Sequence, residues 1–168
     1  ESCASLIGHF EIAVSGARKA LRKGSNLYFR KLMDDDTIPK KRLENLLSVP
    51  IRNGAFVRSK DLGTGTPFVN VVDLYQGFRV VMSNLDLAPG SEKEIMENSV
   101  VRGDIIFNRT SLVLEGVGHN AYIDEDIQGA FFDCHLMRVR LDESKVNPRF
   151  VARYCLSNPG REHIFSRA

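Results

Sequence analysis

The segment GDIIFNRTS, residues 103–111, constrains the fold of this chain most strongly. Gly103 and Asp104 are typical of a turn, and the apolar run Ile105–Phe107 that follows is typical of a buried strand. Asn108–Ser111 then adds four polar side chains directly after that run. The sequence therefore predicts a core strand that carries Asn108–Ser111 as an exposed end.

Short strands are predicted through most of the middle of the chain. From Val49 to Arg140, β-branched and aromatic clusters are separated by glycine, proline and asparagine, with turns expected at Asn53-Gly54 and Gly63–Gly65. The acidic start of Ser91–Asn98 suits a short helix. The candidate strands are Phe56–Arg58, Pro67–Val72, Arg79–Ser83, Asp104–Phe107, Ala121–Ile123 and Asp133–Leu141.

Helices are predicted at both ends of the chain. Apolar residues recur at helical spacing over Phe10–Met33, and Lys40–Leu47 fits a short helical turn. Asn147 is an N-cap with Pro148 at the first helical position, and Asn158-Pro159 repeats this signal before a last helix. We therefore predict an α+β fold, with a curved, mainly antiparallel β-sheet domain flanked by N-terminal and C-terminal helices.

Composition bounds the class of protein. At 168 residues and 43% hydrophobic composition, the chain can bury the core of one principal domain. It has no apolar run of membrane-spanning length and no basic segment ahead of an N-terminal apolar stretch, so we expect a cytoplasmic protein. The first residue is Glu1 rather than Met, which suggests part of a longer protein. Three cysteines without a CxxC pair indicate reduced thiols rather than a disulfide framework.

Catalytic motifs are weak. The glycines of Gly63–Gly65 lack the GK[ST] that a phosphate loop needs, and Asp124–Asp126 is typical of a solvated loop. Cys134 and His135 are adjacent in a predicted strand, so we expect Cys134 to face inward and His135 outward rather than to form a dyad. The four histidines are too far apart for a local metal motif; they are His9, His119, His135 and His163. These observations favour a binding domain over an enzyme.

The polar block Asn108–Ser111 contains the side chains that read DNA bases. Asparagine can bond adenine through two hydrogen bonds and arginine can bond guanine in the same way, while Thr and Ser can bond bases or phosphates. The alternative is that Asn108 and Thr110 cap a turn while Arg109 is solvated. The block alone leaves both interpretations open.

The order of several motifs adds a resemblance to a known family. GTPFVNVVDL contains a strand motif at Gly65–Val69 followed by Asp73-Leu74, VVRGDIIFNRTS contains a second at Gly103–Ile106, and His135–Arg161 forms a closing segment. Together with IPKKRLENLLSVPIRNGAF and EGVGHNAYI, this order resembles the target recognition domain of a type I restriction-modification specificity subunit (S subunit). The resemblance covers roughly residues 38–168.

The resemblance implies a division of the chain and a function. It makes residues 38–146 a DNA target recognition domain, residues 147–168 the start of a C-terminal helical spacer, and residues 1–37 a helical segment that packs on the domain or on a partner. Such a subunit has two recognition domains, each of which reads one half of a split double-stranded DNA target, and it has no catalytic activity itself. This chain holds one domain, so it is a half of a complete subunit, a half subunit that associates with itself, or a part of a fused enzyme.

The resemblance also implies partners and cofactors. Methyltransferase (modification) subunits bring S-adenosylmethionine and methylate adenine, and restriction subunits bring ATP-driven translocation and cleavage with magnesium. No cofactor is expected on this chain itself. The alternative is a protein-docking module of the same complex without a sequence preference of its own, with Phe10–Met33 as its contact surface.

We expect DNA contacts in three loops. A net charge of +2 fits a domain in which phosphate contacts position the protein while base contacts specify the sequence. Tyr75, Gln76 and Arg79 are weaker candidates, and Gly103, Asp104, Pro148 and Tyr154 are predicted to be structural. The candidate DNA-binding residues are Arg58, Ser59, Lys60, Asn108, Arg109, Thr110, Ser111, His119 and Asn120.

Overall fold

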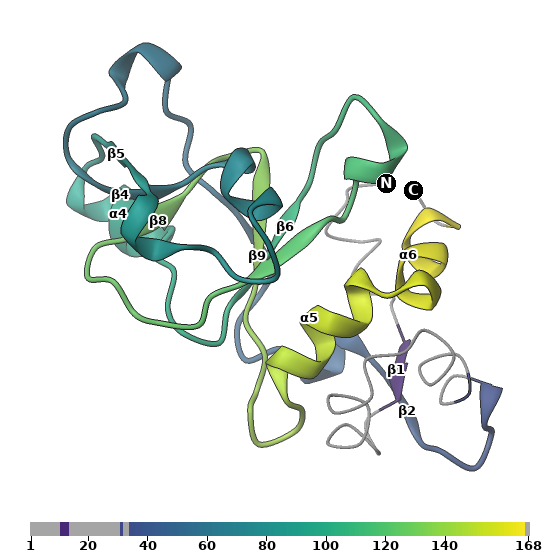
Figure 1. Cartoon of the computed structure of the whole chain (residues 1–168). Helices are drawn as coiled ribbons and strands as arrows, with labels where there is room; N and C mark the ends of the chain where they lie inside the picture. Colours follow the sequence, from purple (N-terminus) through teal and green to yellow (C-terminus); the bar gives the residue numbers. More distant parts are fainter. Residues whose placement is uncertain (1–10, 14–30, 32–33, 167–168) are drawn as a thin grey trace.

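A computed structural model describes residues 11–13, 31 and 34–166 of the chain. They form an α+β fold with mainly antiparallel sheets, as the sequence predicts (Figure 1). The four-stranded sheet has the order β3-β9-β6-β7 and is antiparallel; its strands are β3 (Arg52–Asn53), β6 (Ile105–Asn108), β7 (Asn120–Tyr122) and β9 (Leu136–Val139). The three-stranded sheet has the order β5-β4-β8, and its strands are β4 (Thr66–Val69), β5 (Asp86–Ala88) and β8 (Phe131–Phe132), with β4 and β8 parallel.

Strand β6 is the centre of the core, and all four of its side chains are buried. Ile105 and Phe107 pack with the helices α5 (Pro148–Leu156) and α6 (Asn158–Phe165) in one apolar cluster. Ile106 belongs to a second cluster on the opposite face, together with residues of β4 and β8. Figure 1 accordingly shows β6 and β9 between the two C-terminal helices and the three-stranded sheet. Burial on both faces explains why this strand is a continuous apolar run.

Local capping signals place three helices. Ser91 and Glu94 form a capping box at the start of α4 (Glu92–Glu97), which confirms the short helix predicted there. Asn147 accepts hydrogen bonds from the first backbone N–H groups of α5, with Pro148 at its first position, again as predicted. At α6 the cap is Ser157 rather than Asn158, because the Ser157 hydroxyl accepts from the Gly160 N–H.

Two predicted strands are wrong. Residues 56–58 form no strand, and Phe56 is 71% exposed. Its aromatic side chain was therefore a misleading signal for a buried strand. Over Arg79–Ser83 the chain makes one bridge, from Arg79 to Tyr122, and then enters a 3-10 helix at Met82–Asn84. Apolar and aromatic composition therefore overestimated the strand content here.

Two further predicted strands are shorter than expected. The strand predicted over Pro67–Val72 ends at Val69, because Asn70 caps a 3-10 helix at Val71–Tyr75 through a capping box with Asp73. The strand predicted over Asp133–Leu141 begins only at Leu136, because residues 134–135 form a turn and Asp133 makes only an isolated bridge to Ala55.

The N-terminal prediction is also corrected in part. Glu11–Ala13, expected in a helix over Phe10–Met33, is strand β1, and it pairs with β2 (Lys40–Arg42), where a helical turn was expected. A 3-10 helix at Leu43–Leu46 follows β2. The rest of the predicted N-terminal helix lies outside the described residues. Within the described ranges, no helix combines the length and apolar character needed to cross a membrane.

A buried ion pair anchors the start of β6. Asp104 is fully buried, and its two carboxylate oxygens accept hydrogen bonds from Arg140 at 2.7 and 2.8 Å. The same carboxylate accepts from the Val101 N–H at 2.9 Å, and Gly103 holds the turn with a φ of +97°. The structural roles predicted for Gly103 and Asp104 are therefore confirmed.

Removing the Asp104 carboxylate should destabilise the fold strongly. We expect Asp104→Ala to lower the free energy of unfolding by about 3–5 kcal/mol, because it leaves the Arg140 guanidinium without its partner in a partly buried site. Urea denaturation measures this change. Glu125→Ala at an exposed position is the matched control and should change stability little; equal losses in the two variants would contradict the anchoring role.

Candidate nucleic-acid interface

Two of the predicted DNA-reading loops are the two ends of a single loop. Strands β6 and β7 pair as an antiparallel hairpin, and the pairing continues to Asn108, whose N–H donates to the His119 carbonyl at 2.7 Å. The Gly118 N–H donates back to the Asn108 carbonyl at 2.9 Å. Residues 109–117, called the hairpin loop below, connect these ends and include a 3-10 helix at Leu114–Gly116.

Helix α6 holds one side of the hairpin loop. The guanidinium of Arg161 donates hydrogen bonds to the carbonyls of Glu115 at 2.7 Å and Val117 at 2.8 Å. Gly116 packs so closely that a Cβ there would lie 2.1 Å from the hydroxyl of Ser111. These contacts fix the backbone of the loop although it projects beyond the sheet.

The 3-10 helix that follows β4 holds the other side. Its Tyr75 ring stacks on His119 with ring centroids 4.4 Å apart, and the Tyr75 hydroxyl accepts a hydrogen bond from the Asn108 amide at 3.0 Å. The His119 Nε2 lies 3.0 Å from the Leu74 carbonyl, which can only accept, so this nitrogen carries the ring proton. Burial lowers the pKa of His119 below its ordinary value.

Two of the predicted DNA-reading residues are buried. Asn108 is 2% exposed and Asn120 is fully buried, because the sheet pairing continues to the end of β6. The prediction that Asn108 belongs to an exposed end is therefore wrong. In this arrangement both amides lie within the packed sheet.

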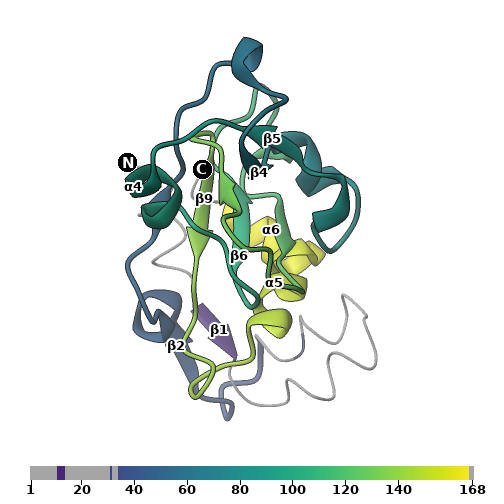
Figure 2. The same ribbon diagram turned by 90° about the vertical axis from the view of Figure 1, so that its left-hand side faces the viewer.

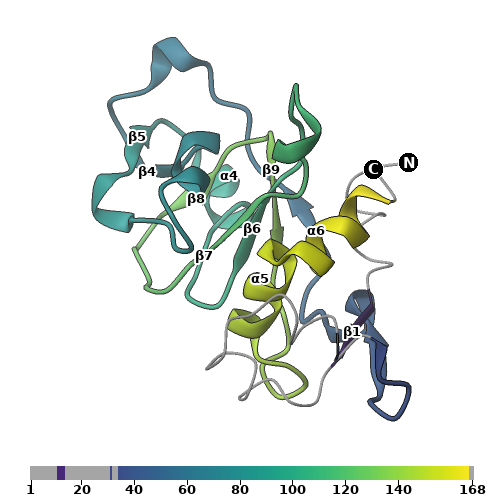
Figure 3. The same ribbon diagram turned by 45° about the vertical axis from the view of Figure 1, so that its right-hand side comes forward.

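The remaining candidates lie at one end of the molecule. Thr110 is exposed, while Arg109, Ser111 and His119 are partly buried. Arg58, Ser59 and Lys60 are exposed, at and just before a 3-10 helix at Ser59–Asp61. Figures 1–3 show this segment and the hairpin loop at the same end, opposite β1 and β2. The structure therefore brings the predicted loops to one end of the sheet frame.

The tip of the hairpin loop is apolar, which the sequence reasoning missed. Leu112 is fully exposed, and Val113 and Leu114 are more than half exposed. A run of apolar residues after a polar block was the available signal. These three side chains therefore lie outside the core.

Asp124 is held by two arginines. It accepts a hydrogen bond from Arg79 at 2.6 Å and lies 3.7 Å from a nitrogen of Arg149. The hydrogen bond from Arg79 holds the pKa of this carboxyl below its ordinary value. Asp124 thus joins two segments of the chain, and Arg79, a weaker DNA-binding candidate, is engaged in that pair.

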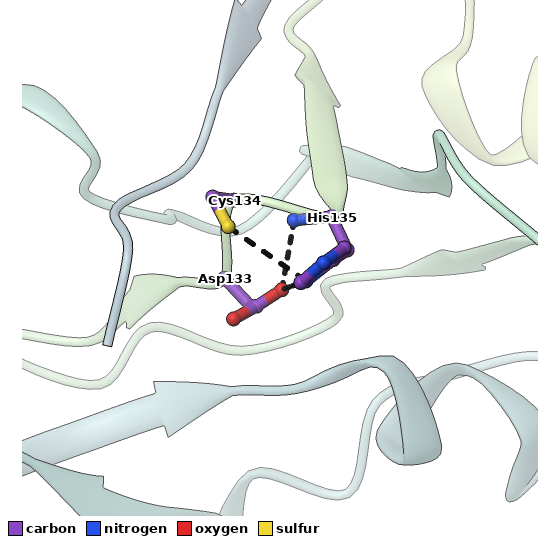
Figure 4. A group of neighbouring side chains, drawn as sticks. All are labelled: Asp133, Cys134 and His135. Atoms are coloured by element: carbon purple, nitrogen blue, oxygen red, sulfur yellow. Dashed lines mark hydrogen bonds and ion pairs between the residues drawn. The ribbon is translucent and has the colours of Figure 1, made fainter. Parts of the chain in front are cut away.

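Asp133, Cys134 and His135 converge on the turn before β9 (Figure 4). The prediction that Cys134 and His135 point to opposite faces fails because these residues are in a turn rather than a strand. Asp133 Oδ1 lies 2.7 Å from His135 Nδ1, and Cys134 Sγ lies 3.7 Å from the same nitrogen. A nucleophile and an orienting carboxylate would need different ring nitrogens. The geometry therefore does not form a catalytic relay.

Comparison with known proteins gives one finding on the fold. No protein-family model and no curated protein matches the chain. A chain in a solved structure concerned with complex assembly and conformational transition of the type I R-M (restriction-modification) system is similar, with a TM-score of 0.52 and 15% sequence identity. The match covers 85% of this chain and 36% of that chain, so this chain spans about a third of its length. At this identity the likeness shows a shared fold.

The buried position of His119 predicts a pH dependence. Because the pKa of His119 is lowered on folding, the unfolded chain binds a proton at a pH where the folded chain does not. The free energy of unfolding therefore decreases as pH falls from about 6.5, the ordinary pKa of histidine, towards the lower pKa of His119 in the folded chain. Urea denaturation should show a smaller loss on acidification for His119→Gln than for the wild type. Identical losses would contradict this assignment.

Proposed function

We propose that this chain is a sequence-specific double-stranded DNA-binding domain of a type I restriction-modification specificity subunit, and that it reads one half of a bipartite target. The observation that carries the proposal is the fold likeness, over 85% of the chain, to a chain from a type I R-M system. The ordered motifs of residues 38–168 support the same assignment from the sequence.

The arrangement of the loops supports DNA reading. The segment at residues 58–60 and the hairpin loop lie at the same end of the molecule (Figure 1), and they contain Arg58, Lys60, Arg109 and Thr110. The Arg109 side chain as a whole is partly exposed, and its Nε has no hydrogen-bond partner among the described residues. The exposed pair of Arg58 with Asp61 is weak and can exchange for a phosphate. We assign Arg109 to base contact and Arg58 and Lys60 to phosphate contact.

This role requires no catalysis by the chain. Methyltransferase subunits would supply S-adenosylmethionine and methylate an adenine flipped from the stack. Restriction subunits would supply ATP- and magnesium-dependent cleavage. A second recognition domain or a second copy of this chain would read the other half of the target, in the cytoplasm.

One observation favours a second candidate function, a protein-docking module of the same complex. Leu112, Val113 and Leu114 expose an apolar tip beside the polar loop residues. Exposed apolar groups on an anchored loop bind partner surfaces through burial of apolar area. In this role the domain would join its complex through the hairpin loop and would show no preference among DNA sequences.

Selection from a randomised duplex library tests the DNA-binding function. We expect enrichment of one short sequence, with affinity that falls as salt rises. On the enriched duplex, Arg109→Ala should cost about 1–3 kcal/mol of binding free energy and relax specificity at one base pair, as Kd measurements would show. Arg42→Ala, on β2 at the opposite end, is the matched control and should bind as the wild type does. Binding without any enrichment would count against the proposal.

The docking function has its own test. For that role we expect Leu112→Ser to weaken binding to a purified methyltransferase subunit about tenfold or more. Burying one leucine side chain in an interface contributes about 1.5–3 kcal/mol of binding free energy. Met96→Ser, an exposed apolar position on α4, is the matched control. Calorimetry measures both affinities. An unchanged affinity for Leu112→Ser would exclude docking through the tip.

A further inference from the structure

Three consecutive side chains on the turn between β8 and β9 direct potential metal ligands to one point (Figure 4). The carboxylate of Asp133, the thiol of Cys134 and the imidazole of His135 each offer one ligand atom, and all three atoms lie within 4.8 Å of one another. Among the residues that the structure describes, this is the one such group of three or more His, Cys, Asp or Glu side chains. The three ligands come from a single turn, so no distant segments have to be brought together.

The distances are close to those of a tetrahedral site. With typical Zn–S and Zn–N bond lengths, a sulfur and a nitrogen ligand lie about 3.6 Å apart. Cys134 Sγ and His135 Nδ1 are 3.7 Å apart. An oxygen and a nitrogen ligand lie about 3.3 Å apart in the same geometry, whereas Asp133 Oδ1 and His135 Nδ1 are 2.7 Å apart. The His135 side chain is 54% exposed and has room to widen this separation.

We propose that Asp133, Cys134 and His135 form a binding site for a thiophilic divalent cation, of which Zn²⁺ is the best fit. A thiolate and an imidazole select zinc over magnesium or calcium, which prefer oxygen ligands. The exposed side of His135 leaves the fourth position of the tetrahedron to water. Zinc binding at these three residues does not require that the chain bind DNA.

Metal binding has a defined proton balance. In the metal-free turn, one proton lies between Asp133 Oδ1 and His135 Nδ1, where the cation would replace it. The His135 ring would then move this proton from Nδ1 to Nε2 and bind the cation through Nδ1, and Cys134 would release its thiol proton to solvent. Burial and the charge of Asp133 raise the pKa of the Cys134 thiol, so the cation must displace a firmly held proton there.

The position of the site gives the metal a structural consequence. The His135 carbonyl accepts a hydrogen bond from the Arg109 N–H at 2.9 Å. Arg109 is the first residue of the hairpin loop, so a metal that stiffens the turn also fixes the start of that loop. Metal occupancy should therefore slow amide hydrogen exchange at Arg109.

Zinc titration of the full 168-residue chain, followed by calorimetry, tests the site. We expect one Zn²⁺ per wild-type chain, and at least a tenfold loss of affinity in both Cys134→Ser and His135→Gln. Co²⁺ as a spectroscopic probe should give a thiolate charge-transfer band that Cys134→Ser abolishes. Glu125→Gln, in an exposed acidic segment, is the matched control and should bind zinc like the wild type.

Several outcomes would overturn the site. Equal zinc affinity in the wild type and Cys134→Ser would show carboxylate or surface binding instead. If Cys3→Ser lost zinc binding while Cys134→Ser kept it, the metal would belong to the Cys3 thiol instead. If Cys134→Ser folds poorly, His135→Gln tests the site independently, because it changes an exposed side chain and should not disturb folding. None of these outcomes depends on whether the chain binds DNA.

Discussion

The structure depends on strand β6, which is buried on both faces and fixed at its start by the ion pair of Asp104 with Arg140. The C-terminal helices pack on one face of β6, and the three-stranded sheet packs on the other. Its far end leads directly into the hairpin loop. The hairpin loop therefore starts and ends at core strands, and Arg161 of α6 holds its backbone between them.

The parts of the fold that sequence reasoning predicted well are those with local causes. The capping box of Ser91 with Glu94 and the Asn147-Pro148 pair specify helix starts through neighbouring residues alone. The continuous apolar run Ile105–Phe107 likewise predicts that β6 is buried, and it is. Strands predicted at Phe56–Arg58 and Arg79–Ser83 failed because strand formation needs a partner that the local sequence does not reveal.

The candidate site was less predictable for the same reason. Asn108 is buried by its pairing with Leu136 of β9, and its amide donates a hydrogen bond to the hydroxyl of Tyr75, which lies 33 residues away in sequence. That two predicted loops form one hairpin follows from the pairing of β6 with β7. The convergence of Asp133 with His135 depends on a turn where a strand was expected. In each case a tertiary contact, rather than residue type, decided the geometry.

The central claim is that the loops at one end of the frame bind DNA, and hydrogen–deuterium exchange tests it most directly. Exchange is measured for the chain alone and with an enriched duplex. We predict slower exchange at residues 56–62 and 109–119, and unchanged exchange in β2 at the opposite end. Protection centred on β2 or α5, with none in the two loops, would contradict the claim.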